Sequence, residues 1–585
     1  GTNIENTPLM FARNRTSFVL LFVSIIQIIL GVYLFRVAVW GPMPLTGIAI
    51  DDGYERASGV VHVHTTLSDG GGSPEDVIAA ARLNSLDFVA ITDHNNLDAF
   101  PYAGYHGDTL ALVGSELSTT VGHLLALGLE EDPGFRFSGN ATDGLVDIHD
   151  LGGFAFVAHP LSPRKGLQWS ATNLTGPWGL EIINGDNQWR RAGLRSIMTL
   201  ALFQLNRPYS LLRIMTSPKD TLTYWDDMLE GRDVIGIFGA DAHNRLSIID
   251  EWSLKFPSYD SLFSLAQNHL LLNNPLSGEA EIDRALILGA LREGRFYIGL
   301  DGLAPADMFS FIIESRDGRQ WTMGQSVPYE PNLRARAGGH VPAGAQIRLL
   351  RDGEMFAETL ETLNIPLPGV GVYRVEVAVD GWQVPWVISN PIPVFERERL
   401  LARTADWPPR SKTVEPAEIL DRFDGNTVFV ASRDTTSMVN ENLLDPDGDR
   451  HNGGAIRIAF RLGQPTSDHP DVFVALVNLE DRDLEGREGI TFWIRADGVY
   501  RMWVQVRDEN LASSDDSTEW WFTSVKTQTD WEQVSVPFTS LRSINPQTDG
   551  QLDLDKVRAI VFVIDKGAMK PGSQGMIWLD DLGVY

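Results

Sequence analysis

Cysteine is absent from this chain of 585 residues. Its absence excludes disulfide bonds and thiolate metal ligands, so any metal site must use histidine and carboxylate side chains. Such ligands suit manganese, iron and zinc. Basic residues are also scarce, since 48 Lys and Arg face 77 Asp and Glu, which gives a formal net charge of −29. We therefore expect no nucleic-acid partner and no attraction to an anionic membrane surface.

Charged residues are missing from one long apolar run, residues 17–35. About 20 apolar residues cross a bilayer as a helix, so this run predicts a single-pass anchor over residues 17–40. Arg13 and Arg15 precede it in a tail of residues 1–16, which predicts a cytoplasmic N-terminus and a body outside the cytoplasm. A cleaved signal peptide is the alternative, although its apolar region usually has about 7–15 residues. We expect a protein of the cell membrane.

Histidine and acidic residues mark the ends of successive apolar runs between residues 59 and 245. His62 and His64 are two residues apart on a strand-like run, so both imidazoles point to one face and can reach the same ion. On their own, two such histidines are more often surface or structural residues. The same residue types follow beside later runs, at Asp69, His94, Glu116, His123, His159, Asp241 and His243. This series predicts a multinuclear metal site at the carboxyl ends of strands in a β/α fold.

These segments resemble the motifs of the polymerase and histidinol phosphatase (PHP) family. The residues that carry the resemblance are His62-x-His64 with Asp69, Thr92-Asp93-His94, Glu116, His159-Pro160 and Asp241-x-His243. The sequences of these segments are most similar to those of the stand-alone metallohydrolase branch, which includes carbaryl-hydrolase-like proteins. The resemblance implies a distorted barrel of seven β/α units over residues 55–305, which holds two or three Mn, Fe or Zn ions.

The resemblance also implies how the ligands are shared among the ions. One ion would be held by His62, His64, Glu116 and Asp241. Glu116 would bridge to a second ion, which His123 and His159 also hold, and a third ion would be held by Asp69, His94 and His243. Asp69 stands where some members of the family have a histidine.

Other polar residues lie close to these ligands in the sequence. Asp93 is adjacent to His94 and is a candidate to orient a ligand imidazole, because such a ring usually needs its second nitrogen held. Arg245 follows His243 and Asn244, and Arg164 and Lys165 follow the histidine–proline pair. We take Asp93 and Arg245 as candidate catalytic residues, and Arg164, Lys165 and Asn244 as candidate contacts to a substrate phosphate. The alternative for the cations is that they are solvated loop residues.

The remainder of the chain is rich in short strand-like runs. Residues 306–395 alternate apolar runs with turn signals, which predicts an immunoglobulin-like β-sandwich. Residues 396–416 are charged and contain three prolines, which indicates a linker. Residues 417–585 resemble the galactose-binding-like jelly rolls that include family 11 carbohydrate-binding modules. The resemblance implies a possible partner, a glycan or an envelope protein, and a structural calcium ion at Asp424 and Asp581, for which solvated turn carboxylates are the alternative.

Six tryptophans lie in the predicted jelly roll: Trp493, Trp503, Trp520, Trp521, Trp531 and Trp578. Aromatic rings stack on sugar rings, but strand tryptophans more often fill the core of a sandwich. Trp520 and Trp521 are adjacent, so one of the two must point outward from a strand.

The first functional hypothesis is a membrane-anchored metal-dependent hydrolase that cleaves a small phosphate ester with a metal-activated hydroxide. An ester or carbamate hydrolase is one alternative. The other is a non-catalytic envelope protein that uses the barrel and the jelly roll to bind protein or glycan. A full set of polar ligands in one cleft favours the enzyme, because a mere scaffold has no reason to bury so many polar groups.

Overall fold

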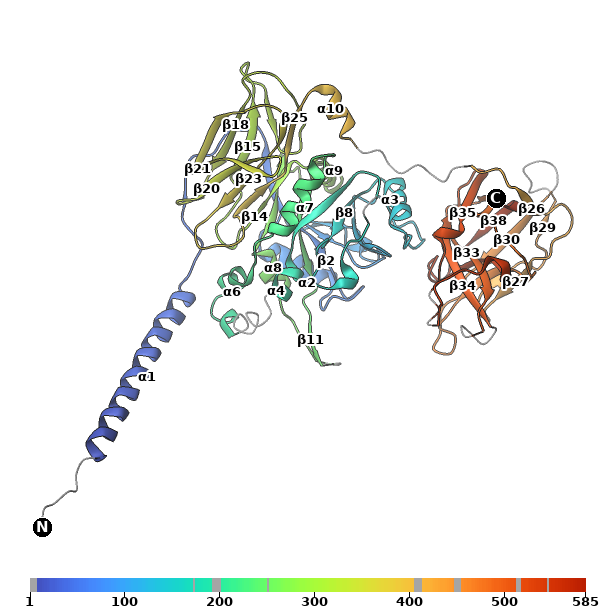
Figure 1. Cartoon of the computed structure of the whole chain (residues 1–585), viewed down its shortest axis with the longest axis horizontal. Helices are drawn as coiled ribbons and strands as arrows, with labels where there is room; N and C mark the ends of the chain where they lie inside the picture. Colours follow the sequence, from blue (N-terminus) through green and yellow to red (C-terminus); the bar gives the residue numbers. More distant parts are fainter. Residues whose placement is uncertain are drawn as a thin grey trace, which may run out of the picture. The chain divides into compact units, whose positions relative to one another are not determined.

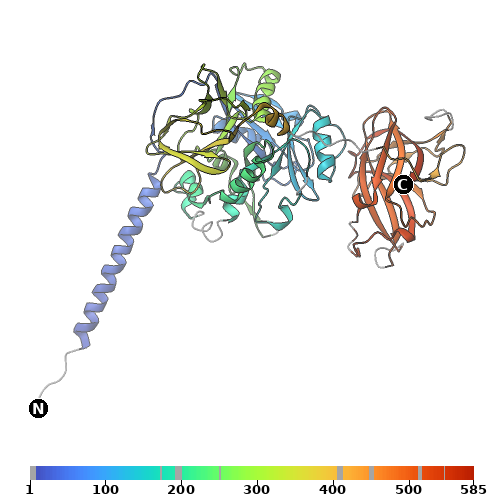
Figure 2. The same ribbon diagram turned by 45° about the horizontal axis from the view of Figure 1, so that its top comes forward.

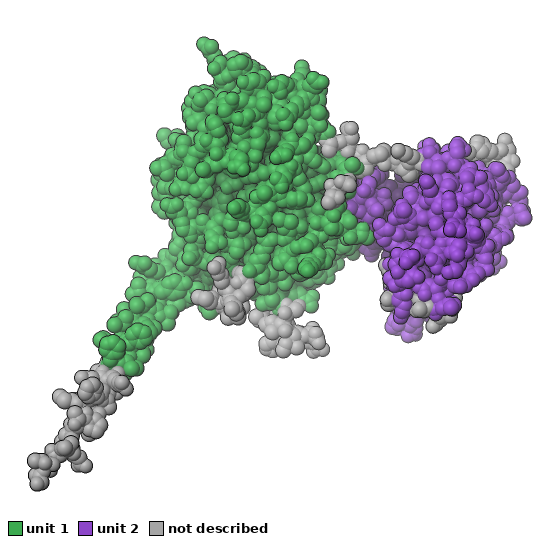
Figure 3. All heavy atoms as spheres, viewed as in Figure 1, with its two compact units in different colours: residues 1–128, 153–406 green, residues 129–152, 407–585 purple. Residues whose placement is uncertain are grey.

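The computed structural model describes residues 8–171, 174–191, 201–249, 252–404, 413–446, 454–511, 517–543, 545 and 547–585. Residues 1–7 of the expected tail and 405–412 of the expected linker lie outside this set. The chain forms two compact units (Figure 3). One contains Gly1–Gly128 and Gly153–Asp406, and the other contains Leu129–Gly152 and Trp407–Tyr585.

The expected anchor coincides with a single helix, α1 (Pro8–Ala38) (Figure 1). Its segment Phe18–Ala38 is long and apolar enough to cross a membrane, and none of its most apolar window is buried. A membrane span and a signal sequence both fit this length and composition.

The first unit contains a closed barrel. Its strands are β2 (Glu55–Val63), β3 (Phe88–Ile91), β5 (Thr109–Val113), β6 (Ser115–Thr119), β7 (Gly122–Leu127), β8 (Phe154–Ala158), β9 (Trp178–Asn184) and β10 (Gly236–Ala242). Strands β8, β9, β10, β2, β3 and β5 pair in parallel, whereas β7 pairs antiparallel with β6 and β8. Because β6 continues β5 after Gly114, the barrel has the seven strand positions that the PHP resemblance implies.

The barrel strands are apolar along their length because both of their faces are covered. Every residue of β3, β8, β9 and β10 is buried. Helix α2 (Pro74–Leu83) follows β2; Ser73 caps its first turn by accepting from the backbone N–H of Asp76. Helix α9 (Ala280–Glu293) ends at Gly294, whose φ of 73° provides the left-handed cap.

Helices lie between β9 and β10. They are α4 (Gly185–Arg191), α6 (Arg207–Ile214) and α7 (Lys219–Leu229). Residues 192–200 lie outside the described part of the chain.

The barrel sheet continues into the sandwich region. Strand β13 (Gln267–Leu272) pairs with β2, β14 (Phe296–Gly299) pairs with β13, and β24 (Val387–Ser389) pairs with β14. From β24 the sheet extends through β23 (Gly371–Ala378), β20 (Gln346–Arg351) and β21 (Glu354–Leu360). A second sheet contains β16 (Gln320–Thr322), β15 (Phe309–Glu314), β18 (Arg334–Gly339) and β22 (Thr362–Pro366). The region thus has two sheets, one of which is shared with the barrel.

The second unit is a two-sheet β body, which Figure 2 shows in orange to red. One sheet is built on β30 (Ala455–Arg461), β38 (Gln574–Val584), β32 (Gly489–Ala496) and β35 (Glu532–Pro537). The other has the order β27 (Val430–Arg433), β31 (Phe473–Asn478), β37 (Val557–Asp565), β33 (Arg501–Glu509), β34 (Thr518–Lys526) and β36 (Arg542–Ser543). Alternate residues of these strands meet in one apolar core. The jelly-roll-like fold expected of this segment is therefore present.

Candidate metal centre

The strand ends that carry the expected ligands have an irregular backbone. Five residues there adopt positive φ although they are not glycine: His62 (65°), Asn95 (52°), His159 (32°), Asp241 (48°) and Asn244 (50°). The strand register also shifts next to His62 on β2 and next to Asp241 on β10. Such bulges redirect side chains, and strained backbone of this kind concentrates at functional sites.

Glu116, near the start of β6, lies at the centre of the cluster and is only 1% exposed. Five imidazoles have a nitrogen within 3.3 Å of its carboxylate: His62, His64 and His94 at Oε2, and His123 and His159 at Oε1. Each oxygen therefore faces its own set of rings. A carboxylate in this position can bridge two cations.

Three groups of side chains each bring their ligand atoms within 4.8 Å of one another. The groups are His62, His64, Glu116 and Asp241; His64, Asp69, His94 and His243; and His94, Glu116 and His123. The first equals the set that the PHP resemblance gives to one ion. The second contains the set given to a third ion, with one histidine added. The third shares two residues, Glu116 and His123, with the set that the resemblance gives to the second ion. Together the contacts bring all nine expected ligands into one cluster.

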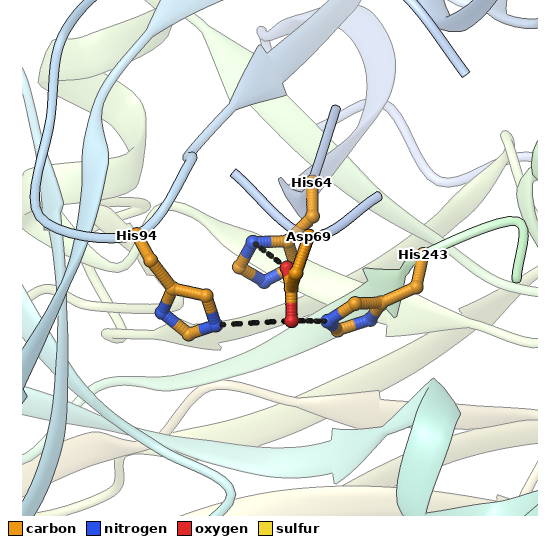
Figure 4. A group of neighbouring side chains, drawn as sticks. All are labelled: His64, Asp69, His94 and His243. Atoms are coloured by element: carbon orange, nitrogen blue, oxygen red, sulfur yellow. Dashed lines mark ion pairs between the residues drawn. The ribbon is translucent and has the colours of Figure 1, made fainter. Parts of the chain in front are cut away.

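Figure 4 shows the group around Asp69, whose carboxylate lies between the rings of His94 and His243. The Asp69 carboxylate lies 3.3 Å from Nε2 of His243 and 3.8 Å from the nearest nitrogens of His64 and His94. Its side chain is 53% exposed, whereas His64 is fully buried. The turn can carry Asp69 close to the strand end because Gly70 has no Cβ, which would lie 2.3 Å from the backbone oxygen of His64.

Several buried polar atoms of the cluster make close contacts but no hydrogen bond of good geometry with any described residue. They are Nε2 of His62, both ring nitrogens of His64, Nδ1 of His94, Oδ2 of Asp241 and Oδ1 of Asn244. Buried polar atoms are normally paired, and an unpaired one costs about 1–3 kcal/mol. These atoms are imidazole nitrogens and oxygens, the donor types that Mn, Fe and Zn accept. The residues present therefore fit a set of divalent ions.

The electrostatics of the cluster also fit bound cations. Burial opposes the charged form of His62, but Glu181, Glu116 and Asp241 outweigh it and raise its pKa well above the ordinary value. Burial likewise opposes the charge on His159, and Glu116 nevertheless raises its pKa to about 9. The carboxylates thus favour positive charge at the imidazoles, a charge that metal ions supply while protons are released.

Glu181, in the middle of β9, is a site residue that sequence reasoning missed. Its Oε1 accepts from Nδ1 of His62 at 2.5 Å, and its Oε2 accepts from the backbone N–H of His159 at 2.7 Å and from Nδ2 of Asn184 at 2.9 Å. A Cβ at Gly239 on the neighbouring strand would lie 1.8 Å from Oε1 of Glu181. The glutamate in an otherwise apolar strand was the available signal.

Asp93 is bound to the turn that precedes Asp69. Its carboxylate accepts from the backbone N–H and the hydroxyl of Thr65, each at 2.7 Å, and from the hydroxyl of Ser68 at 2.5 Å. These bonds fix the turn that carries Asp69. Asp93 is therefore placed to position a ligand-bearing loop, and its expected contact with the His94 ring is not among its described hydrogen bonds.

The expected substrate contacts differ in their surroundings. Arg245 and Lys165 are exposed. Arg164 is paired with Asp186 at 3.2 Å. Asn244 is 7% exposed and its Oδ1 is unpaired within the cluster. Of these four residues, Asn244 and Arg245 are the two that come next in the sequence after the expected ligand His243.

The calcium residues expected in the C-terminal segment form no comparable group. Asp424 is exposed, and Asp581 accepts from Nη1 of Arg422 at 3.3 Å. Neither belongs to a metal-ligand group among the described residues. The calcium site stays a prediction.

The tryptophans of this segment are mostly outside its core, contrary to the common pattern for strand tryptophans. Trp521 is 8% exposed and belongs to the core cluster. Its neighbour Trp520 is 37% exposed. The expectation that one of this adjacent pair points outward is confirmed. Trp493, Trp503, Trp531 and Trp578 are half-buried.

Comparison with known proteins supports the reading of the C-terminal segment. A model of the carbohydrate-binding domain of family 11 matches residues 405–582. A solved family 11 module from Clostridium thermocellum, in complex with a β-1,3-1,4-mixed-linked tetrasaccharide, is 18% identical and has a TM-score of 0.24. The matched region spans 29% of this chain and 95% of the solved module. The family match confirms the resemblance of this segment to such modules.

Two further proteins of other kinds are similar to this chain. A two-domain protein from Bacteroides vulgatus that contains a predicted PHP-like metal-dependent phosphoesterase is 14% identical, with a TM-score of 0.30. The matched region spans 60% of this chain and 99% of the Bacteroides protein. An uncharacterized protein of Methanocaldococcus jannaschii is 30% identical over 121 residues, which are 18% of this chain and 67% of that protein. Through this stretch the chain belongs to the same family as the archaeal protein.

Proposed function

We propose that the barrel of this chain is a metal-dependent hydrolase that cleaves small phosphate esters at a site of two or three divalent ions. The observation that carries the proposal is the convergence of five imidazoles on the two oxygens of one buried carboxylate, Glu116. When bound, the ions supply a hydroxide nucleophile at neutral pH and neutralise the charge that develops on the substrate oxygens.

The residues of the chain divide the remaining work. Glu116 contacts both the fully buried and the more exposed imidazoles of the cluster. Glu181 accepts from Nδ1 of His62, so the lone pair of Nε2 stays available as a ligand. The cluster opens on the side of Asp69, whose side chain is half exposed, while His62 and His64 are fully buried. Substrate would therefore enter beside Asp69.

Phosphate is favoured over other esters by the cation at this entrance. Arg245 follows His243, whose imidazole lies 3.3 Å from Asp69. An exposed guanidinium there can pair with two phosphate oxygens. A carboxylic ester or a carbamate carries no such charge, so the exposed arginine favours the phosphoesterase over the ester or carbamate hydrolase.

We also propose that the C-terminal module binds glycan on the outer face of its six-stranded sheet. Met502, Val504 and Val506 of β33 point into the core, so Trp503 between them points to the outer face. The ring of Trp503 lies 5.3 Å from that of Phe522 on β34. A separate apolar cluster of small residues lies on the same face: Ala475, Ala559, Val561 and Val563. Aromatic rings on an outer sheet face suit the stacking of sugars.

The membrane anchor completes the proposal. The exposed apolar segment Phe18–Ala38 holds the protein in the cell membrane as a single span, with the N-terminus in the cytoplasm and the acidic body outside. The alternative of a non-catalytic envelope protein keeps the glycan face and the anchor but predicts no turnover.

The proposal is tested with purified protein loaded with Mn²⁺, Fe²⁺ or Zn²⁺. The substrates are bis-p-nitrophenyl phosphate, p-nitrophenyl phosphate, p-nitrophenyl acetate and 1-naphthyl N-methylcarbamate. Hydrolysis of a phosphate ester, lowered in Arg245→Ala and unchanged in Arg316→Ala, supports the proposal; Arg316 is an exposed arginine of the sandwich region. Preference for the acetate or carbamate supports the ester hydrolase, and no turnover of any of them supports the non-catalytic protein.

A further inference from the structure

The segment that joins β7 to β8 packs within the C-terminal module. It contains α3 (Ala141–Asp150), and it belongs to the second unit although its flanking strands belong to the barrel. Phe135 is 5% exposed and is part of the core cluster of the module. It also pairs through its backbone with Met569. The segment is thus built into the module.

Charged pairs hold the segment at one end of the outer sheet face. Asp147 is 1% exposed, and its carboxylate lies 2.5 Å from Nη2 of Arg501 and 3.0 Å from Nζ of Lys526. Nζ of Lys526 also lies 2.6 Å from Asp150. Arg501 begins β33 and Lys526 ends the antiparallel β34, and the two residues are register partners. The segment therefore covers this end of the face.

The covered end and the proposed glycan face are the same surface. Arg501 and Trp503 are two residues apart on β33, and their partners on β34 are Lys526 and Ser524. Side chains two residues apart on a strand share a face. The Nη1 of Arg501 donates to the hydroxyl of Ser524 at 2.8 Å. A glycan on the rings of Trp503 and Phe522 would thus meet α3 at this end.

A cavity of about 320 Å³ lies under α3 at this corner. Among the residues that line it are Asn140, Asp143, Val146, Arg501, Ser524 and Glu532. Its volume is at the lower end of the range for small-molecule pockets, about 300–1,000 Å³. The cavity reaches the open edge of β34 and the facing strand β35, so it lies at a corner of the sheet.

The lining suits a neutral ligand that is rich in hydroxyl groups. Arg501 is 2% exposed and its Nε is buried without a hydrogen-bond partner. Acidic side chains outnumber basic ones around the cavity, which disfavours an anion. Carboxylate and amide groups beside apolar valines are the surroundings that hydroxyl groups and ring carbons of a sugar require.

We propose that this cavity binds the terminal sugar of a glycan chain whose following residues lie on the outer face of the six-stranded sheet. The proposal rests on the proposed glycan binding and makes it specific for chain ends, because α3 closes the face where an uninterrupted chain would have to continue. An internal stretch of polysaccharide has no way past the segment, whereas a chain end has a cavity to enter.

The test uses the full chain and a soluble mixed-linkage β-glucan, before and after partial cleavage by an endoglucanase, compared at equal mass. Isothermal titration measures the number of binding sites per mass of glucan. Recognition of chain ends predicts that this number rises in proportion to the number of ends. Val146→Trp fills the cavity and should lose this binding. Glu131→Trp, on an exposed residue of the same segment outside the cavity lining, should keep it.

Asp143→Asn keeps the size of its side chain and serves as a second variant should Val146→Trp not fold, which circular dichroism shows. It should weaken binding to cleaved glucan. An unchanged number of sites per mass after cleavage would overturn the chain-end proposal while leaving glycan binding intact. Normal binding by both cavity variants would overturn it as well. Absence of binding to either glucan by the unmodified protein would reject the glycan function and the chain-end proposal together.

Discussion

Glu181→Gln is the substitution that examines the support of the metal centre most closely. In the structure one carboxylate oxygen accepts from Nδ1 of His62, and the other accepts from the backbone N–H of His159 and from Asn184. A glutamine has one accepting oxygen and one NH₂ donor. If its oxygen keeps His159 and Asn184, its NH₂ faces Nδ1 of His62, which must then accept. The proton of His62 moves to Nε2, the nitrogen that faces Glu116 at 3.1 Å.

The opposite orientation of the amide is no better. With the oxygen on His62, the NH₂ faces the two donors from His159 and Asn184, and both buried bonds are lost. Each lost bond of this kind costs about 1–3 kcal/mol. Loss of the group that orients a ligand histidine typically lowers metal affinity or activity about 10–100-fold. We expect an effect of that size on both quantities.

The assay is competition for Mn²⁺ and Zn²⁺ against a chromogenic chelator, with turnover measured on the same samples. Glu354→Gln is the matched control, since Glu354 is an exposed strand residue of the sandwich region. The control should behave as the unmodified protein. Metal affinity within twofold of normal in a folded Glu181→Gln protein would refute the orienting role.

Three further predictions follow from the packing and the chain's first helix. Gly239→Ala should weaken metal binding to a similar extent in chelator competition, because its Cβ would displace Glu181; an unaltered affinity would contradict the close approach. Asp147→Ala leaves the buried charge of Arg501 without its ion pair to Asp147, so the unfolding free energy of the second unit should fall by about 3–5 kcal/mol in denaturant titration. Asp150→Ala, at a more exposed pair, should cost at most about 1 kcal/mol, and equal losses would count against the argument. Protease added to spheroplasts should digest the body behind residues 8–38, and full protection would reverse the topology.

The convergence of the candidate ligands was predictable from the sequence because each stands at or near the end of an apolar run. His62, His64 and Glu116 stand beside apolar runs whose carboxyl ends must meet in a parallel barrel. Alternation along a strand predicts that His62 and His64 face the same site, and both do. The rule does not explain His62 fully, because this residue lies at a bulge with a φ of 65°. Its position depends on pairing with both neighbouring strands, which the sequence of one strand does not contain.

Other parts of the fold depend on contacts between distant segments. Glu181 acts across a neighbouring strand, through the space left by Gly239; its place in an apolar run marks it as unusual, but the run does not show which residues it contacts. The packing of Phe135 and Asp147 in the C-terminal module joins residues more than 350 positions apart. Strand periodicity could identify outward tryptophans such as Trp503 only after the face of each strand was known.

The central claim, that Glu116 bridges divalent ions in a hydrolase, is tested most directly by counting metal ions per chain in the unmodified protein and in Glu116→Gln. Glutamine keeps the size of the side chain but removes the charge that offsets adjacent dications. Inductively coupled plasma mass spectrometry should find two or three metal ions per unmodified chain and at least one fewer in the variant. Turnover of the phosphate ester by the variant should be lower by about 100-fold or more. A full metal complement and normal turnover in Glu116→Gln, or no bound metal in the unmodified protein, would contradict the claim.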